Sequence, residues 1–261
     1  MRILMIGDIV GRAGRKIVRE LLPQIIKEHK VDLVIANGEN AAGGNGITQA
    51  IAEELYSYGV DILTMGNHVW DKKEIFDFID YDDRILRPAN YPLGTPGKGF
   101  LIFSAAEGFK VGVINLSGRV FLNSLDCPFR LANQLIQEIR EATPNIIVDF
   151  HAEATSEKVA FGWYLNGRVS AVLGTHTHVQ TADERVLPGG TAYITDVGMT
   201  GPRDSVLGVK IDQVITKFTT QLPVHFEAAR GMAQFNGVLV DLEPLTGKAI
   251  DIRRLQMILE S

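Results

Sequence analysis

The chain has 261 residues, of which 46% are hydrophobic and 22% charged, and its net charge is −5. These values are those of an ordinary globular protein, and the length suits a single α/β domain spanning residues 1–261. The acidic balance and the lack of a Lys/Arg-rich run argue against a partner such as a long nucleic acid.

The compartment is also constrained by the sequence. The only cysteine, Cys127, cannot form an internal disulfide, which favours a reducing environment. Residues 1–6 are too short for a signal peptide, and no apolar run approaches the roughly 18–20 residues of a membrane span. We therefore expect a cytoplasmic protein without a membrane partner. A homo-oligomer is compatible with the sequence.

Strands and helices are predicted to alternate in the first half of the chain. Apolar β-runs occur at 1–6, 33–36 and 62–65. Apolar residues recur with helical spacing at 17–26 and 51–58, where Thr48 caps the second helix and Gly59 ends it. Polar residues follow each β-run, and this order predicts a largely parallel sheet with its site at the carboxyl ends of the strands.

The second half is predicted to be more antiparallel. Residues 84–99 are rich in proline and glycine and are expected to be irregular, and a hairpin turn is expected at Glu107-Gly108. Predicted strands lie at 100–104, 110–116, 146–150, 169–173, 192–195, 233–242 and 249–259. Predicted helices lie at 129–141 and 211–220, and a Gly/Pro loop is expected at 198–202.

Two histidines follow the predicted strand at 169–173, in the run Gly174-Thr175-His176-Thr177-His178. In an extended chain, residues two apart point the same way, so both imidazoles are expected to face one side. Paired imidazoles at a strand end are well placed to hold a metal ion.

Polar residues that suit metal binding recur at the other strand ends. The set comprises Asp8, Glu39, Asn40, Asn67, His68, His151, His176 and His178. Carboxylate, carboxamide and imidazole without thiolate suit iron, manganese or zinc. The set exceeds the four ligands of one closed zinc site, so two metals sharing a carboxylate are expected. Two divalent ions, two carboxylates and a bridging hydroxide leave a charge of about +1, which suits phosphoryl transfer.

Simpler roles exist for several of these residues. Asp8 could cap the following helix, and Asn40 could be only a turn former. Asp149 could support His151 from behind or bond within the sheet edge. The remaining histidines, His29 and His225, are expected to be solvated. The first strand with Gly7, Gly11 and Gly14 also suggests a dinucleotide-binding module, but the spacing is not G-x-G-x-x-G.

The strand-end motifs resemble the calcineurin-like metallophosphoesterase signature. They are Gly7-Asp8, Gly38-Glu39-Asn40, Gly66-Asn67-His68, the lone His151 and the 174–178 run. Three departures stand out. Val10 replaces the first histidine, Glu39-Asn40 replaces the second aspartate, and the last motif reads Gly-Thr-His-Thr-His.

These departures resemble the bacterial YmdB-like family, known for hydrolysing 2′,3′-cyclic nucleotides. The segments 37–44, 87–92, 150–158 and 198–208 are similar to that family too, so the resemblance covers nearly the whole chain. It implies an α/β sandwich of two sheets with flanking helices, of the metallophosphoesterase type. It also implies 3′-monophosphate products, formed by in-line attack of a metal-bound hydroxide.

The resemblance also implies roles for the site residues. One metal, commonly iron, is held by Asp8, Glu39, Asn40 and His178. Glu39 bridges to a second metal held with Asn67, His151 and His176. His68 then protonates the leaving oxygen. The alternative is a metal-containing regulatory or scaffold protein with weak phosphodiesterase activity.

Overall fold

The computed structural model describes residues 1–105 and 108–259, whose strands form two sheets. The order in the first sheet is β2 (Asp8–Ile9), β12 (Met199–Pro202), β13 (Ala233–Glu243), β1 (Arg2–Ile6), β3 (Leu33–Asn37), β4 (Ile62–Thr64) and β5 (Ile85–Leu86), with β14 (Lys248–Leu259) paired to β13. The order in the second is β10 (Arg185–Val186), β11 (Ala192–Ile194), β9 (Ala171–Thr175), β8 (Ile146–His151), β7 (Lys110–Ser117) and β6 (Phe100–Ser104).

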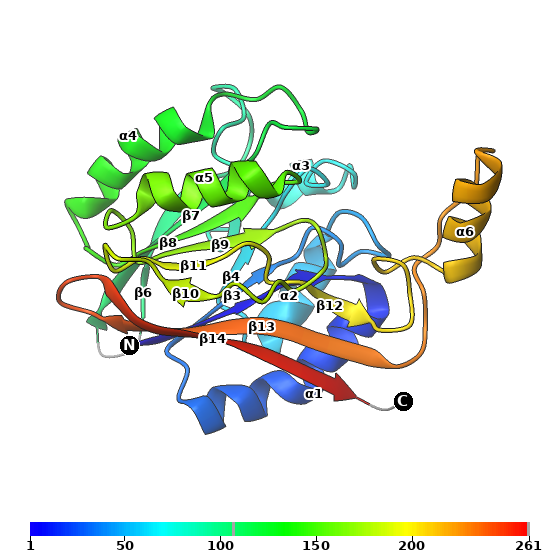
Figure 1. Cartoon of the computed structure of the whole chain (residues 1–261), viewed down its shortest axis with the longest axis horizontal. Coiled ribbons are helices and arrows are strands. Elements are labelled where there is room, and N and C mark those ends of the chain that lie inside the picture. The colour runs from blue at the N-terminus through cyan, green and yellow to red at the C-terminus, as the bar shows by residue number, and fades with distance from the viewer. Residues whose placement is uncertain (106–107, 260–261) are drawn as a thin grey trace.

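Helices cover the outer faces of both sheets (Figure 1). The helices are α1 (Gly11–His29), α2 (Gln49–Ser57), α3 (Ile75–Phe78), α4 (Pro128–Arg140), α5 (Thr155–Leu165) and α6 (Ile211–Thr220). Helices α1 and α2 pack on the first sheet, and α4 and α5 pack on the second. Among the described residues, no helix is long and apolar enough to cross a bilayer.

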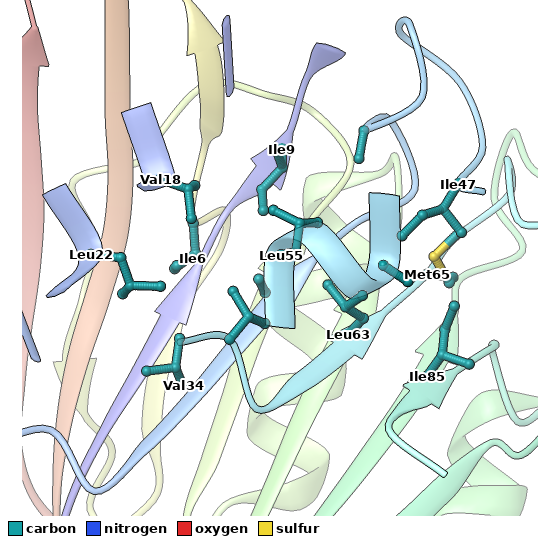
Figure 2. Close-up of a cluster of buried hydrophobic side chains, with 14 of the residues drawn as sticks. Ile6, Ile9, Val18, Leu22, Val34, Ile47, Leu55, Leu63, Met65 and Ile85 are labelled. Carbon is teal, nitrogen blue, oxygen red and sulfur yellow. The ribbon is translucent and has the colours of Figure 1, made fainter. Parts of the chain in front are cut away.

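Three apolar layers hold these elements together. Figure 2 shows the first, in which Val18 and Leu55 from the helices lie against Ile6 and Leu63 of the first sheet. The second layer lies between the sheets, where Met5 and Ile35 belong to the same buried cluster as Leu173 and Ile194. The third joins α4 and α5 to the second sheet and includes Ile136, Phe150 and Phe161. The expected two-sheet α/β sandwich is confirmed.

Helix α6 differs from the others because it stands beside the sandwich (Figure 1). Val214 is its one buried residue, whereas Ile215 and Phe218 are exposed. Its bounds coincide with the helix expected at 211–220.

Most predicted elements are present, with corrections where the sequence signal was weak. Thr48 caps α2 by accepting a hydrogen bond from the backbone of Ile51 at 3.4 Å. The strands of the predicted hairpin pair as β6 and β7, whereas its turn residue Glu107 lies outside the described residues. The loop expected at 198–202 was wrong, because Met199–Pro202 forms β12 between β2 and β13. The prediction omitted α3, α5 and the shortest strands.

The two sheets also differ from the expected division into parallel and antiparallel halves. β1, β3 and β4 are parallel, as predicted, and β5 joins them from the segment that was expected to be irregular. β13 pairs antiparallel with β1 and β14. However, β7, β8, β9 and β11 of the second sheet are also parallel. The carboxyl ends of parallel strands are therefore available from both sheets.

Close backbone approach at Gly174 predicts a stability effect. A Cβ atom there would lie 1.8 Å from the carbonyl oxygen of Thr195, so Gly174→Ala must separate β9 from the chain beyond β11. We expect this change to lower the free energy of unfolding by about 3 kcal/mol. Gly94→Ala is the control, since Gly94 has a φ of +85° but open space around it, and should cost about 1–2 kcal/mol. Urea unfolding measures both, and equal losses would contradict the steric explanation.

Candidate metal centre

The polar residues predicted from strand ends meet where the two sheets end side by side. Asp8 follows β1, Glu39 follows β3, and Asn67 follows β4, all in the first sheet. His151 ends β8 and His176 follows β9 in the second sheet. Because parallel strands present their carboxyl ends on the same edge, side chains far apart in the sequence become neighbours.

Three side chains meet around the Nε2 atom of His151. This nitrogen lies 3.1 Å from Glu39 Oε1 and 3.0 Å from Asn67 Oδ1. The Nδ1 atom of His176 approaches it to 3.0 Å, and ligand atoms of Glu39, His151 and His176 all lie within 4.8 Å of one another. Imidazole lone pairs and oxygen atoms that face one another repel unless a proton or cation lies among them. This set therefore fits a metal ion.

A second group of donor atoms lies around Asp8. Its Oδ1 atom is buried, has no hydrogen-bond partner among the described residues, and lies 3.7 Å from His178 Nε2. Asn40 Oδ1 is also buried without a hydrogen-bond partner among the described residues, and Asn40 lines the same cavity as His178. Burying an unpaired oxygen is unfavourable, so these two atoms fit a second cation.

Asp8 does not have the simpler role of a helix cap, whereas Asn40 does stabilise its turn. Asp8 does not cap α1, because Val10 occupies the N-cap position and makes no side-chain cap hydrogen bond. Asn40 does hold its own loop, since its Nδ2 donates to the Gly44 carbonyl at 3.0 Å. That contact leaves the Asn40 oxygen free to act as a ligand, so the turn-forming role and the ligand role are compatible.

His176 and His178 are not in extended chain, and this part of the prediction was wrong. β9 ends at Thr175, and the two histidines have φ values of 101° and 66° in the left-handed region. They turn to different partners: His176 to His151, and His178 to Asp8. The pair thus reaches both groups of donor atoms, which an extended chain would not allow.

Each of the three central histidines has one ring nitrogen occupied by an acceptor outside the cluster. His178 Nδ1 donates to the Leu207 carbonyl at 3.0 Å. His151 Nδ1 lies 2.9 Å from the hydroxyl of Thr175, and His176 Nε2 lies 3.0 Å from Glu153. The remaining nitrogen of each ring faces inward, and in the neutral imidazole it carries the lone pair that a cation would bind. Ligating histidines need this arrangement, because the outer contact fixes the tautomer and the ring orientation.

Electrostatics at the cluster favour a positive charge at its centre. Burial would raise the pKa of Glu39, but the facing His151 outweighs burial and lowers it to about 2. Burial would lower the pKa of His151, yet Glu39 and Asp8 raise it to about 9. Burial, and then His151, lower the pKa of His176 to about 3, and burial raises the pKa of Asp8. A bound cation can therefore replace the proton of His151, because metal binding releases ligand protons.

A cavity of about 240 Å³ opens beside the cluster, and His68 lies on its wall. The Nδ1 atom of His68 lies 2.8 Å from Asp71 Oδ2, and its backbone N–H donates to Glu39 Oε2 at 2.9 Å. These contacts hold the ring at the mouth of the site. His225 is exposed and His29 is partly buried, and neither lines this cavity.

Three supporting residues were missed or left open by the sequence prediction. Glu153 contacts His176. The only sequence feature that could have indicated this role is that Glu153 lies two residues after His151. Thr175 accepts from His151 and donates to Asp149 Oδ1 at 2.7 Å. Asp149 therefore supports His151 through Thr175, and also accepts from Thr64 across the sheets.

The glycines that suggested a dinucleotide-binding module have another function here. A Cβ atom at Gly7 would lie 1.9 Å from the Gly198 carbonyl oxygen, and one at Gly14 would lie 2.4 Å from the Thr200 oxygen. Both positions let β12 and its flanking backbone pack closely beside β1 and α1. The dinucleotide-binding interpretation was wrong.

A two-sheet sandwich with nitrogen and oxygen donor atoms gathered at the strand ends is the arrangement typical of calcineurin-like metallophosphoesterases. Within this class the chain belongs to the YmdB-like protein family, whose sequence model matches residues 4–255. The resemblance seen in the sequence motifs is thus confirmed.

Alignments with similar proteins extend over almost the whole chain. A Bacillus subtilis protein named 2′,3′-cyclic-nucleotide 2′-phosphodiesterase is 56% identical, over 98% of this chain and 96% of its own. The structure of a hypothetical protein from Thermus thermophilus has 43% identity and a TM-score of 0.93, covering 99% of both chains. That of a Mycoplasma pneumoniae phosphatase has 37% identity and a TM-score of 0.93, covering 99% of this chain and 93% of its own.

The contact of Glu153 with His176 leads to a prediction about metal affinity. Glu153→Ala removes the acceptor that orients the imidazole, and we expect Mn²⁺ to bind about 10–100-fold more weakly. Competition with a chelator measures this affinity. Glu141→Ala removes an exposed carboxylate beyond α4 and should leave the affinity unchanged. Equal affinities in the two variants would show that Glu153 does not orient His176.

Proposed function

We propose that the protein is a two-metal phosphodiesterase that opens 2′,3′-cyclic nucleotides at the 2′ oxygen and releases 3′-monophosphates. The observation that carries this proposal is the cluster around His151 Nε2, with the unpaired oxygen atoms of Asp8 and Asn40 beside it. The substrate is taken from the name of the Bacillus subtilis relative, to which the chain is 56% identical.

The donor atoms divide into two sets that share one carboxylate. Asp8, Glu39, Asn40 and His178 would hold one ion, and Glu39, Asn67, His151 and His176 the other. Nitrogen and oxygen donors without thiolate favour iron or manganese, and zinc also fits. When bound, the two cations supply a nucleophilic water at neutral pH and neutralise charge on the phosphoryl oxygens.

The cavity suits a small anion only with cations present. Its lining includes the carboxylates of Glu39 and Glu153 but neither lysine nor arginine among the described residues. A phosphate group would therefore be repelled by the protein alone, and bound metals must supply the attraction. The volume of about 240 Å³ fits a single phosphodiester group with its sugar better than a polynucleotide strand.

His68 has the position of a general acid. In the imidazolium form of His68, Nδ1 donates to Asp71 and Nε2 carries the proton that goes to the leaving 2′ oxygen. An alkoxide is a poor leaving group near neutral pH, so this proton matters to turnover. The intact His68–Asp71 contact favours hydrolysis over a regulatory or scaffold role with weak activity. The single free cysteine, Cys127, favours the cytoplasm as the compartment.

The first prediction from this proposal concerns metal and product. Protein loaded with manganese or iron should bind about two ions, convert 2′,3′-cyclic AMP to 3′-AMP, and lose this activity when stripped by a chelator. Chromatography of the products and elemental analysis measure these outcomes. Preference for 3′,5′-cyclic AMP, or release of 2′-AMP, would contradict the assignment.

The second prediction isolates His68. His68→Ala should keep its metals but lose about 10²–10⁴-fold in turnover of 2′,3′-cyclic AMP. It should lose far less on a nitrophenyl phosphodiester, whose leaving group needs no proton. His225→Ala, at an exposed histidine outside the cavity, is the matched control and should change neither rate. Equal losses on both substrates would exclude His68 as the general acid.

A further inference from the structure

The loop that carries two of the proposed ligands has an unfavourable backbone conformation. His176 and His178 both have positive φ values, 101° and 66°, which residues other than glycine rarely adopt. Such a conformation persists only where the surrounding contacts determine it. Thr177 lies between the two histidines, so its contacts reveal what holds the loop.

Thr177 is fixed by the buried carboxylate of Asp196. The backbone N–H of Thr177 donates to Asp196 Oδ2 at 3.0 Å, and its hydroxyl donates to the same oxygen at 2.7 Å. The other oxygen, Oδ1, accepts from the Gly198 backbone at 2.8 Å. The Gly198 carbonyl in turn accepts from the Asp8 backbone at 3.0 Å. One carboxylate thus connects the histidine loop to the segment that carries Asp8.

A lysine of α5 also contacts the Asp196 carboxylate and the chain just before the histidine loop. The side chain of Lys158 is only 1% exposed, and its Nζ donates to Asp196 Oδ2 at 2.6 Å and to the Thr175 carbonyl at 2.7 Å. Thr175 is the last residue of β9 and directly precedes His176. Lys158 therefore bonds the chain immediately before the left-handed turn as well as the carboxylate that holds its middle.

We propose that Lys158 and Asp196 are positioning residues whose buried ion pair sets the left-handed conformation of residues 176–178. Through it, His176 is directed to His151 and His178 to Asp8. The inference rests on the proposed function only in taking the two histidines as metal ligands. It also gives a role to Lys158, the last residue of the 150–158 segment, in which His151 and Glu153 already have roles at the site.

The chemistry of the contacts requires these two side chains. Asp196 Oδ2 accepts three hydrogen bonds, two from Thr177 and one from Lys158, while Oδ1 accepts one. Asparagine would offer one oxygen in place of two and could not accept all four. A buried carboxylate without Lys158 would lack its neutralising charge. Either substitution should release the loop toward ordinary negative φ values.

The experiment compares Asp196→Asn and Lys158→Met with Asp241→Asn. Asp241 pairs with Arg2 at 2.6 Å, at the opposite end of β1 from the site, and is the matched control for loss of an ion pair. In metal-free protein, the Thr177 amide should exchange with solvent at least about tenfold faster in the first two variants. Mn²⁺ affinity, measured by chelator competition below the unfolding transition, should fall about 10–100-fold.

Thr177→Val provides a second test that spares the buried pair. It removes the hydroxyl donor from a half-buried position and should weaken Mn²⁺ binding several-fold without lowering the melting temperature. If Lys158→Met does not fold, this variant and Asp196→Asn decide the question. Unchanged Thr177 exchange and unchanged Mn²⁺ affinity, with stability losses like that of Asp241→Asn, would overturn the positioning role.

The outcomes also separate this inference from the proposed function. A wild-type protein that binds Mn²⁺ but hydrolyses no cyclic phosphodiester would overturn the proposed function alone. If the wild-type protein bound no Mn²⁺, the exchange rate of the Thr177 amide would still test the role of Lys158 and Asp196, because it is measured without metal.

Discussion

The close approach of the two sheets at Gly66 is the constraint on which the rest of the site depends. A Cβ atom there would lie 2.2 Å from His151 Nε2 and 2.4 Å from Glu39 Oε2. Any side chain would therefore occupy the space where donor atoms from both sheets meet. Glycine lets the backbone after β4 lie close to these donor atoms, and the neighbouring Asn67 can then reach His151. Gly66, two residues after the end of β4, thus leaves the space in which the donor atoms meet.

Around that point lie inner donor atoms and, outside them, the acceptors that hold the imidazole rings. Inner nitrogen and oxygen atoms face one another, and each imidazole is held from outside by a different acceptor: a hydroxyl, a carboxylate and a backbone carbonyl. These acceptors come from Thr175, Glu153 and Leu207, which lie on separate segments. Because no outer contact is shared, the orientation of each ring is fixed independently. The geometry of the centre consequently depends on several segments at the carboxyl ends of the strands.

The sequence was sufficient to predict the strands and the residues that follow them, because apolar runs ending in polar residues are local signals. It identified Glu39, Asn67 and His151 as strand-end residues, and the family resemblance implied that they share one metal. It did not predict β12, whose pairing partners are distant in the chain and whose Gly and Pro content is typical of loops. Nor did it predict the left-handed turn at His176, since that conformation depends on buried contacts from α5 and Asp196.

The placement of donors on both sheets has a thermodynamic consequence. An ion held by Glu39 of the first sheet and His151 of the second would link the two layers directly, and unfolding would have to release it. Ligand binding of this kind stabilises the folded state by about 2.7 kcal/mol when the free ligand is at 100 times its Kd. The melting temperature would then depend on the concentration of free metal in the solution. Metal supply would in this way be coupled to the resistance of the protein to heat.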